Sequence, residues 1–193
     1  MGDPRKQRKK YETPRFPWRT DTLQAELRLV GEYGLRNKRE LWRHRTMLSK
    51  YRGIARSLLG MSSEQRQILE KQLLARLSRL GILPETSVLD NVLDLSLEDI
   101  LERRLQTLIL RKSMARSIYQ ARQLITHGHI AIGNRRVFSP SYLVLKDDED
   151  KIAFSLTSVV ANPEHPLRQL VTVEAKPSQR QRPSAERTEA GER

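Results

Sequence analysis

The sequence predicts an α+β fold, with a mostly helical N-terminal domain followed by a small domain that contains a helix pair and a short β-sheet. Apolar residues recur at helical spacing over most of residues 22–80, which is typical of amphipathic helices. Two later helices are preceded by residues that favour N-caps. Near residue 133, a Gly-Asn pair separates two short strand-like runs, which predicts a hairpin.

The chain opens with an arm that has no core of its own. Residues 2–19 combine three prolines with many lysines and arginines, so we expect an extended conformation. Tyr11, Phe16 and Trp18 could stack on bases or anchor the arm to the protein, and for Trp18 we favour packing against the protein. The basic side chains are expected to reach phosphates: Lys9, Lys10, Arg15 and Arg19.

Helical periodicity then begins near Thr22, where a short helix should end at Gly31 or Gly34. Asn37 precedes Glu40 by three residues, which is an N-cap signature for a long basic amphipathic helix. Its cations should lie largely outside the apolar face: Lys38, Arg39, Arg43, Arg45, Arg52 and Arg56.

A third helix is predicted from the pair Ser62 and Gln65, which is typical of a capping box, to Gly81 and Pro84. Its apolar stripe is interpreted as scaffold and comprises Ile68, Leu69, Leu73, Leu77 and Leu80.

The next predicted helix follows Ser96 and covers the run LEDILERRLQTLIL, with Arg103, Arg104 and Arg111 in outer or flanking positions. Beyond the connector RKSMAR, Ser117 begins another helix, which Gly128 should end. The runs HIAI and RRVF should form the hairpin, whereas SYLVL and KIAFSL are further strand candidates.

The net charge of +13 predicts an anionic partner, and its distribution is uneven. Residues 1–60 carry a net charge of +10 and residues 101–146 a net charge of +8, whereas residues 61–100 carry −3. Two basic surfaces are therefore expected to grip a phosphate backbone. Nucleic acid is the leading partner, an anionic membrane surface is second, and a generally basic soluble surface is the third interpretation.

Several classes of protein are disfavoured. The chain has no cysteine, which excludes a disulfide framework and thiolate zinc sites. Its apolar runs are too short to span a bilayer, and no apolar signal core follows the basic N-terminus, so we expect a soluble cytoplasmic protein. The sequence contains no phosphate-binding glycine loop, nucleophile elbow or paired general acid and base, so neither enzyme activity nor a cofactor is expected.

Two clusters could suggest metal ions. His127 and His129 would share one face of a strand, but no nearby Asp, Glu or Cys completes a ligand set. The acidic run at residues 147–150 lacks the alternating ligands and the glycine of a calcium loop. We therefore expect no metal site, and we interpret the acidic run as a solvated turn.

The segments RRLQTLIL and ARSIYQARQLITHGHIAIGNRRVFSPSYLV resemble the S-four-type RNA-binding domain in order, spacing and length. Upstream, YETPRFPW and GEYGLRNKRELWR resemble the N-terminal domain of the small-subunit ribosomal protein four family, and ANPEHPLR resembles its archaeal form. The resemblance covers nearly the whole chain, except the tail that begins at Lys176.

This resemblance suggests four regions. We expect an extended basic arm over residues 1–20 and a helical domain over residues 21–96. The S-four-type domain would cover residues 97–172, and a flexible, disordered tail would cover residues 173–193.

The resemblance implies a structural constituent of the small ribosomal subunit that binds small-subunit rRNA directly as a primary binder. It also implies nucleation of the assembly of the subunit body and a contribution to translational accuracy near the channel through which mRNA enters. The implied partners are rRNA, small-subunit ribosomal protein five, other neighbouring ribosomal proteins and mRNA. A ribosome-bound, cytoplasmic location without a membrane partner follows. The alternative is a free RNA-binding factor.

Position in the motif implicates a first set of RNA-binding residues: Arg104, Arg111, Lys112, Arg122, Gln123 and His127. Charge and location alone add Arg103, Arg116, Arg135 and Arg136. Two departures from the family pattern are a Gly-Asn turn in place of Asn-Gly, and Gln106 where the family has Asp. From their expected place on a polar face, we predict that Ala at positions 104 and 122 weakens rRNA binding with little change in thermal stability.

Overall fold

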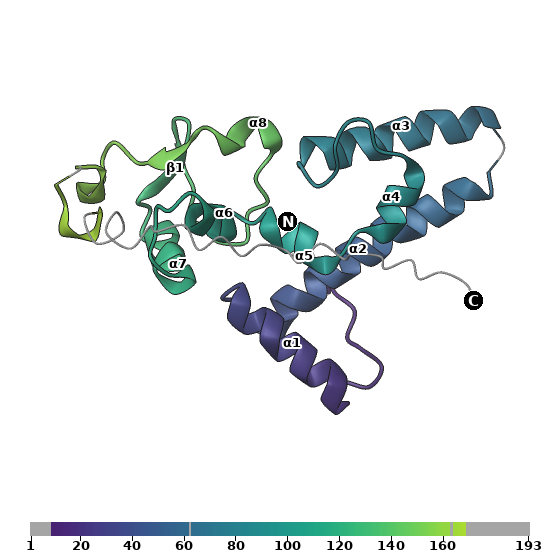
Figure 1. The fold of residues 1–193 in the computed structure, drawn as a ribbon, viewed down its shortest axis with the longest axis horizontal. Coiled ribbons are helices and arrows are strands. Elements are labelled where there is room, and N and C mark those ends of the chain that lie inside the picture. Colours follow the sequence, from purple (N-terminus) through teal and green to yellow (C-terminus); the bar gives the residue numbers. More distant parts are fainter. Residues whose placement is uncertain (1–8, 62, 163, 169–193) are drawn as a thin grey trace, which may run out of the picture.

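The computed structural model describes residues 9–61, 63–162 and 164–168 (Figure 1). The long helix α2 (Lys38–Leu59) runs through the middle of the molecule, with α1 (Thr20–Glu32) crossing it and α3 (Ser63–Arg79) folded back along it. The other elements are α4 (Leu89–Asp94), α5 (Leu97–Glu102), α6 (Leu105–Arg111), α7 (Ile118–Thr126), β1 (Ile130–Ile132), β2 (Arg135–Arg136), α8 (Lys146–Glu149), β3 (Ile152–Phe154) and the 3-10 turn Val159–Ala161. The predicted α+β class is confirmed.

Local capping signals predicted the starts of α2 and α7 correctly. The side chain of Asn37 accepts a hydrogen bond from the backbone N–H of Glu40 at 3.2 Å, and α2 begins at the next residue. Ser117 likewise accepts from the N–H of Gln120 at 3.2 Å at the start of α7. Ser62, the expected cap of α3, lies outside the described residues.

The hairpin and the last strand are also confirmed. Ile132 pairs with Arg135 across the Gly133–Asn134 turn, and Gly133 has a φ of +56°, which glycine adopts without strain. The sheet order is β2-β1-β3, with both pairs antiparallel. The run KIAFSL supplies β3, as predicted.

The long helix predicted over LEDILERRLQTLIL is wrong, because the structure breaks it between α5 and α6. Arg104 instead forms an isolated β-bridge with Leu143, and the N–H of Leu105 donates to the carbonyl of Tyr142 at 2.8 Å. The run SYLVL therefore adds a single bridge to this break and not a strand to the sheet. The short helices α4 and α8 were not predicted.

Apolar side chains form three packed clusters. The first lies under the sheet against α6 and α7, and the second joins α2, α3 and α4. The third joins Tyr33, Leu35, Leu41 and Leu101, which packs α5 against the N-terminal helices. The stripe predicted on α3 is only partly correct, because Ile68 and Leu69 are exposed.

Candidate nucleic-acid interface

One face of α7 carries exposed side chains that suit contact with RNA. Tyr119, Gln123 and His127 follow one another at intervals of four residues, so they share this face, and all three are exposed. The ring of His127 stacks on that of His129 with centroids 6.2 Å apart. Tyr119 was missing from the sequence prediction, although its spacing from Gln123 could have identified it.

The hairpin and the segment after it carry exposed cations and a further exposed aromatic ring. Arg135 and Arg136 on β2 are exposed, and neither has an ion pair within the described part of the chain. Phe138 is also exposed, and a Cβ added at Gly128 would lie 2.5 Å from its ring. This contact places the segment after β2 against the end of α7. We define the α7–β2 surface as Tyr119, Gln123, His127, Arg135, Arg136 and Phe138.

The cations of α2 occupy two different sides of the helix. Lys38, Arg45 and Arg52 are spaced by seven residues and lie on one side, together with Arg56. Part of their charge is neutralised within the protein, because Lys38 and Arg45 form ion pairs with Glu26 at 3.3 and 3.9 Å. Arg52 donates to the carbonyl of Leu95.

Arg39 and Arg43 lie on the other side of α2, four residues apart and exposed. No ion pair to either is found among residues 9–61, 63–162 and 164–168. This side of α2 therefore carries uncompensated positive charge.

The described part of the arm, residues 9–19, has no regular secondary structure and is anchored to α2. Tyr11 stacks on Trp42 with centroids 6.0 Å apart, and the N–H of Glu12 donates to Thr46 Oγ1 at 3.0 Å. Trp18 is 85% exposed, so the prediction that it packs against the protein is wrong. Phe16 is exposed as well.

The four cations in the described part of the arm lie at the surface. All four are exposed: Lys9, Lys10, Arg15 and Arg19. Lys10 has no ion pair to another described residue. Lys9 lies 4.9 Å from the centroid of the Tyr11 ring, and Arg15 lies 5.4 Å from that of Phe16. Arg19 approaches Asp21 at 3.6 Å. Aromatic and basic groups are interspersed along this stretch.

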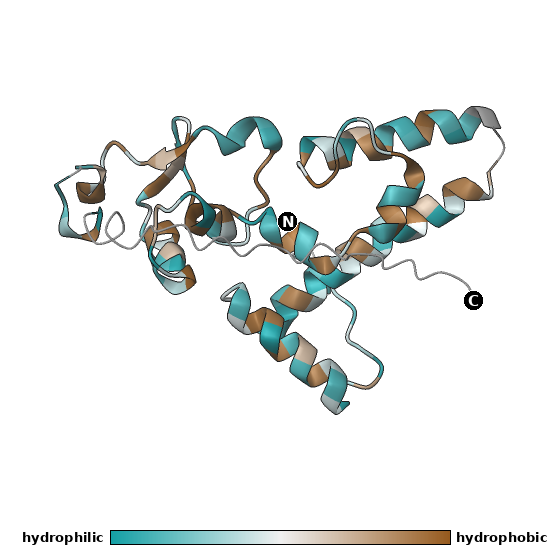
Figure 2. Cartoon of the chain, viewed as in Figure 1, coloured by the Kyte–Doolittle hydropathy of each residue, from teal (hydrophilic) through white to brown (hydrophobic). Residues whose placement is uncertain are grey.

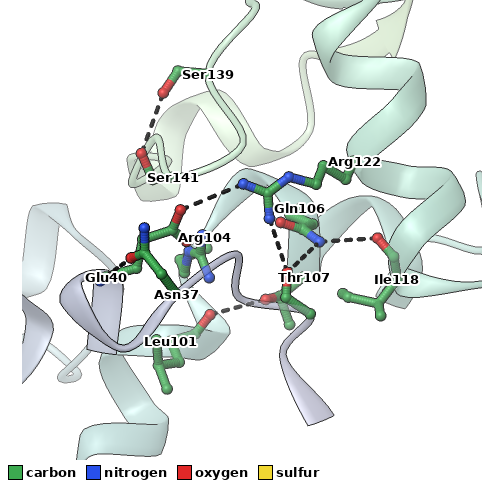
Figure 3. A network of polar contacts seen from close by, with 11 residues as sticks. Asn37, Glu40, Leu101, Arg104, Gln106, Thr107, Ile118, Arg122, Ser139 and Ser141 are labelled. Carbon is green, nitrogen blue, oxygen red and sulfur yellow. Dashed lines mark hydrogen bonds and ion pairs between the residues drawn. The ribbon is translucent and has the colours of Figure 1, made fainter. Parts of the chain in front are cut away.

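Arg104 is completely buried, so its predicted place on an exposed polar face is wrong. Its Nη2 donates to Glu40 Oε2 at 2.9 Å, and Arg122 Nη2 donates to the other oxygen of the same carboxylate at 3.4 Å (Figure 3). Arg122 also donates to the carbonyl of Gly34 at 3.0 Å and is largely buried. One carboxylate of α2 thus holds two arginines of the later helix pair.

Gln106 completes this contact between the two parts of the chain. Its buried Nε2 donates to the carbonyl oxygens of Gly34 and Ile118 at 3.3 and 2.9 Å. Gly34 has a φ of +54°, and an added Cβ would lie 2.8 Å from the Ile118 side chain. We name the group Gly34, Glu40, Arg104, Gln106 and Arg122 the buried joint.

Burial at the joint also affects ionisation. Burial lowers the pKa of Arg104, although Glu40 opposes this change. Burial and the neighbouring charge of Arg104 lower the pKa of His44 from 6.5 to about 4. His44 is therefore neutral at pH 7.

Three other predicted RNA contacts are paired with acids. Arg103 donates to Glu149 at 2.7 Å and is largely buried, whereas the exposed Arg111 donates to Glu102 at 2.5 Å. Lys112 contacts the carbonyl of Glu149 and lies 3.8 Å from Asp150. The acidic run at residues 147–150 is therefore a set of internal counter-ions as well as a surface segment. Arg116, two residues before α7, is exposed.

The described residues contain no group of three or more His, Cys, Asp and Glu side chains that could hold a metal ion. No described helix is both long enough and apolar enough to cross a membrane.

Comparison with known proteins gives the family. The S4 domain matches residues 103–150, which include α6, α7 and the hairpin. Small ribosomal subunit protein uS4 of Hyperthermus butylicus is 56% identical over 161 residues, which are 83% of this chain and 92% of that protein. The uS4 proteins of Metallosphaera sedula and Ignicoccus hospitalis are 53% and 54% identical, over 84% and 82% of this chain and 91% and 95% of their own lengths.

The chain belongs to the uS4 family of small ribosomal subunit proteins. The family inferred from the sequence motifs is therefore confirmed, including its archaeal type. A role as a ribosomal protein with an RNA-binding S4 domain, and not as an enzyme, follows from this membership.

Proposed function

We propose that the chain binds small-subunit rRNA directly, as a structural constituent of the small ribosomal subunit. The observation that carries this proposal is the α7–β2 surface, which includes two exposed arginines without an ion pair in the described structure and two exposed aromatic side chains. Arginine contacts phosphates with a planar fork of donors, and aromatic rings stack on unpaired bases. A surface that only faced water would not need this combination.

The proposed RNA contacts extend beyond this surface to exposed cations on the arm and on α2. The proposed set outside it is Lys9, Lys10, Arg15, Arg19, Arg39, Arg43, Arg45, Arg56, Arg111 and Arg116. Lys38, Arg52, Arg103, Lys112 and Arg122 are partly buried and contribute mainly long-range positive potential. Arg104 positions the two parts of the chain and does not contact RNA.

Rigid placement of these cations on two joined units suits a primary binder, because one protein can then hold two segments of RNA before other proteins bind. We extend the proposal to nucleation of the subunit body, contact with ribosomal protein uS5, and an effect on translational accuracy near the path of mRNA. The protein then works in the cytoplasm, bound to the ribosome. A free RNA-binding factor remains the second candidate function, and the high identity to uS4 proteins favours the first.

Binding of the purified protein to its own small-subunit rRNA and to unrelated duplex RNA, across a salt series, tests the proposal. Six phosphate contacts give a slope of about −4 to −5 in a plot of log affinity against log salt. The double variant Arg135→Ala/Arg136→Ala should bind rRNA more weakly and reduce this slope by roughly 1.5 to 2. Lys146→Ala, which removes an exposed cation of α8 near Glu85, is the matched control and should leave the slope nearly unchanged.

A preference for rRNA that survives raised salt supports specific recognition, because shape and fixed contacts outlast the nonspecific electrostatic attraction. Equal affinities for both RNAs that fall together with salt contradict the proposal. They would leave only a general polyanion-binding surface.

A further inference from the structure

A groove of about 1350 Å³ lies between α2 and α3, outside the proposed RNA contacts. Apolar residues of α2 and α3, together with Leu143 and Leu145, line most of it. Ile54 is 46% exposed there, and Met61 and Leu69 are exposed as well. Hydrophobic residues are visible on both helices in Figure 2. Exposed apolar side chains that gather in one groove favour an interaction site.

The rim of this groove is basic. Lys50, Arg76 and Arg79 contribute to its lining, and none of the lining residues whose side chains the structure describes is acidic. Arg76 lies 5.9 Å from the centroid of the Tyr51 ring, and no ion pair to Lys50 or Arg79 occurs in the described ranges of the chain. The groove thus combines an apolar floor with unpaired positive charge at its edge.

We infer that this groove is the docking site for an acidic amphipathic helix of a neighbouring protein in the subunit. The apolar face of such a helix would fill the groove, and its carboxylates would meet Lys50, Arg76 and Arg79. The α2 wall from Met47 to Leu58 is about 17 Å long at 1.5 Å per residue, which matches a helix of about three turns. The partner's place in the ribosome rests on the proposed function, whereas the chemistry of the groove does not.

Charge and polarity decide between this occupant and two others. RNA would bring phosphates to a floor that offers mainly carbon atoms, so only the rim could bind it. A second copy of this chain would bring another basic rim, and the two rims would repel each other. An acidic amphipathic helix matches both the apolar floor and the basic rim of the groove.

Gly53 offers a way to block the groove with little effect on the fold. It lines the groove within α2, and a Cβ added there meets nothing within 4 Å. Leu at this position would occupy part of the groove, and replacement of a glycine inside a helix also favours the helical state. Gly53→Leu should therefore fold normally, which circular dichroism and thermal unfolding can verify.

Site-specific photo-crosslinking in assembled small subunits identifies the occupant. Benzoylphenylalanine replaces Ile54 in the full-length protein, and the matched control carries it at Leu27, which is 53% exposed on α1 and does not line the groove. We expect the probe at position 54 to crosslink to one acidic helical segment of another ribosomal protein. Gly53→Leu should lower the yield at least tenfold, and Lys50→Glu with Arg79→Glu at least fivefold, while the Leu27 probe gives no such crosslink.

The inference would be overturned if the probe at position 54 crosslinked mainly to RNA, to a second copy or to this chain itself. It would also be overturned if no crosslink formed, or if Gly53→Leu left the crosslink yield unchanged. If the wild-type protein does not enter the particle, the proposed function fails, and a synthetic probe then tests the groove alone. This probe is a labelled 14-residue helix with Leu on one face and Glu on the other, compared with a Lys counterpart. The inference is supported if the wild-type protein binds the Glu peptide tenfold more tightly than the Lys peptide and Gly53→Leu abolishes this preference. It is overturned if the wild-type protein and Gly53→Leu bind the Glu peptide equally, or if the wild-type protein binds the two peptides equally.

Discussion

Arg104 in the buried joint and Arg136 on the α7–β2 surface are the same residue type in opposite environments. Arg104 is fully buried and pairs with Glu40, whereas Arg136 is exposed and has no ion pair among the described residues. A buried charge has lost its hydration, so removal of its partner is strongly destabilising. An exposed charge stays hydrated and is accessible to RNA. The number of arginines therefore does not identify the proposed RNA-binding residues, and burial distinguishes these from the arginines that hold the fold together.

The largest expected effect is at the joint. Arg104→Ala leaves Glu40 with the longer contact to Arg122 as its one ion pair among the described residues, and it removes a large side chain from a packed site. We expect the free energy of unfolding to fall by about 3–5 kcal/mol, which urea denaturation measures. This expectation replaces the sequence-based prediction that stability would hardly change.

Arg136→Ala is the matched control and should change the free energy of unfolding by less than about 0.5 kcal/mol. Equal effects of Arg104→Ala and Arg136→Ala on stability would contradict the division between a structural and an RNA-facing arginine.

A smaller effect is expected from substitution of Gly34, the residue that contributes its backbone to the buried joint. Gly34→Ala forces an L residue to a φ of +54° and brings its Cβ within 2.8 Å of Ile118, so we expect a loss of about 2–3 kcal/mol. Gly31→Ala is the control, because Gly31 lies in α1 and an added Cβ meets nothing within 4 Å. It should be neutral or stabilise by up to about 1 kcal/mol. Similar losses for both variants would show that the close approach at Gly34 is unimportant.

The smallest expected effect concerns pH and His44. Its pKa is about 4 in the folded protein, below the ordinary 6.5. Between these values the unfolded chain binds more protons, so stability is present above pH 6.5 and is lost as the pH falls toward 4. Protonation linked to His44 alone should lower the free energy of unfolding by about 2 kcal/mol between pH 7 and pH 5.

The measurement is the free energy of unfolding of the wild-type protein and of His44→Leu at both pH values. The difference between pH 7 and pH 5 should shrink by about 2 kcal/mol in the variant. His127→Gln, which alters an exposed histidine, should retain the wild-type pH dependence. An unchanged pH dependence in His44→Leu would mean that other groups cause it.

Features with local causes could be predicted from the sequence. Asn37 with Glu40, Ser117 with Gln120, and the Gly133–Asn134 turn are each set by residues within a few positions, and the structure has all three. The family motif was local too, so the family could be identified.

Features with distant causes could not be predicted. The break between α5 and α6 depends on the bridge to Leu143, about forty residues away, and helical periodicity carries no trace of it. That break turns Arg104 inward, so the error in the helix also produced the error in the site. Trp18 was misjudged for a related reason, since nothing in the arm specifies which of its aromatic residues meets Trp42.

The joint also has a consequence for the order of events during synthesis. Gly34 and Glu40 leave the ribosome first, and their partners Arg104 and Arg122 follow 64 to 88 residues later. Until then Glu40 stays solvated, and the N-terminal helices lack the contacts that fix their orientation to α6 and α7. The two parts of the chain therefore become one rigid unit only after α7 has been made, so the relative placement of the basic surfaces is among the last features of the fold to form.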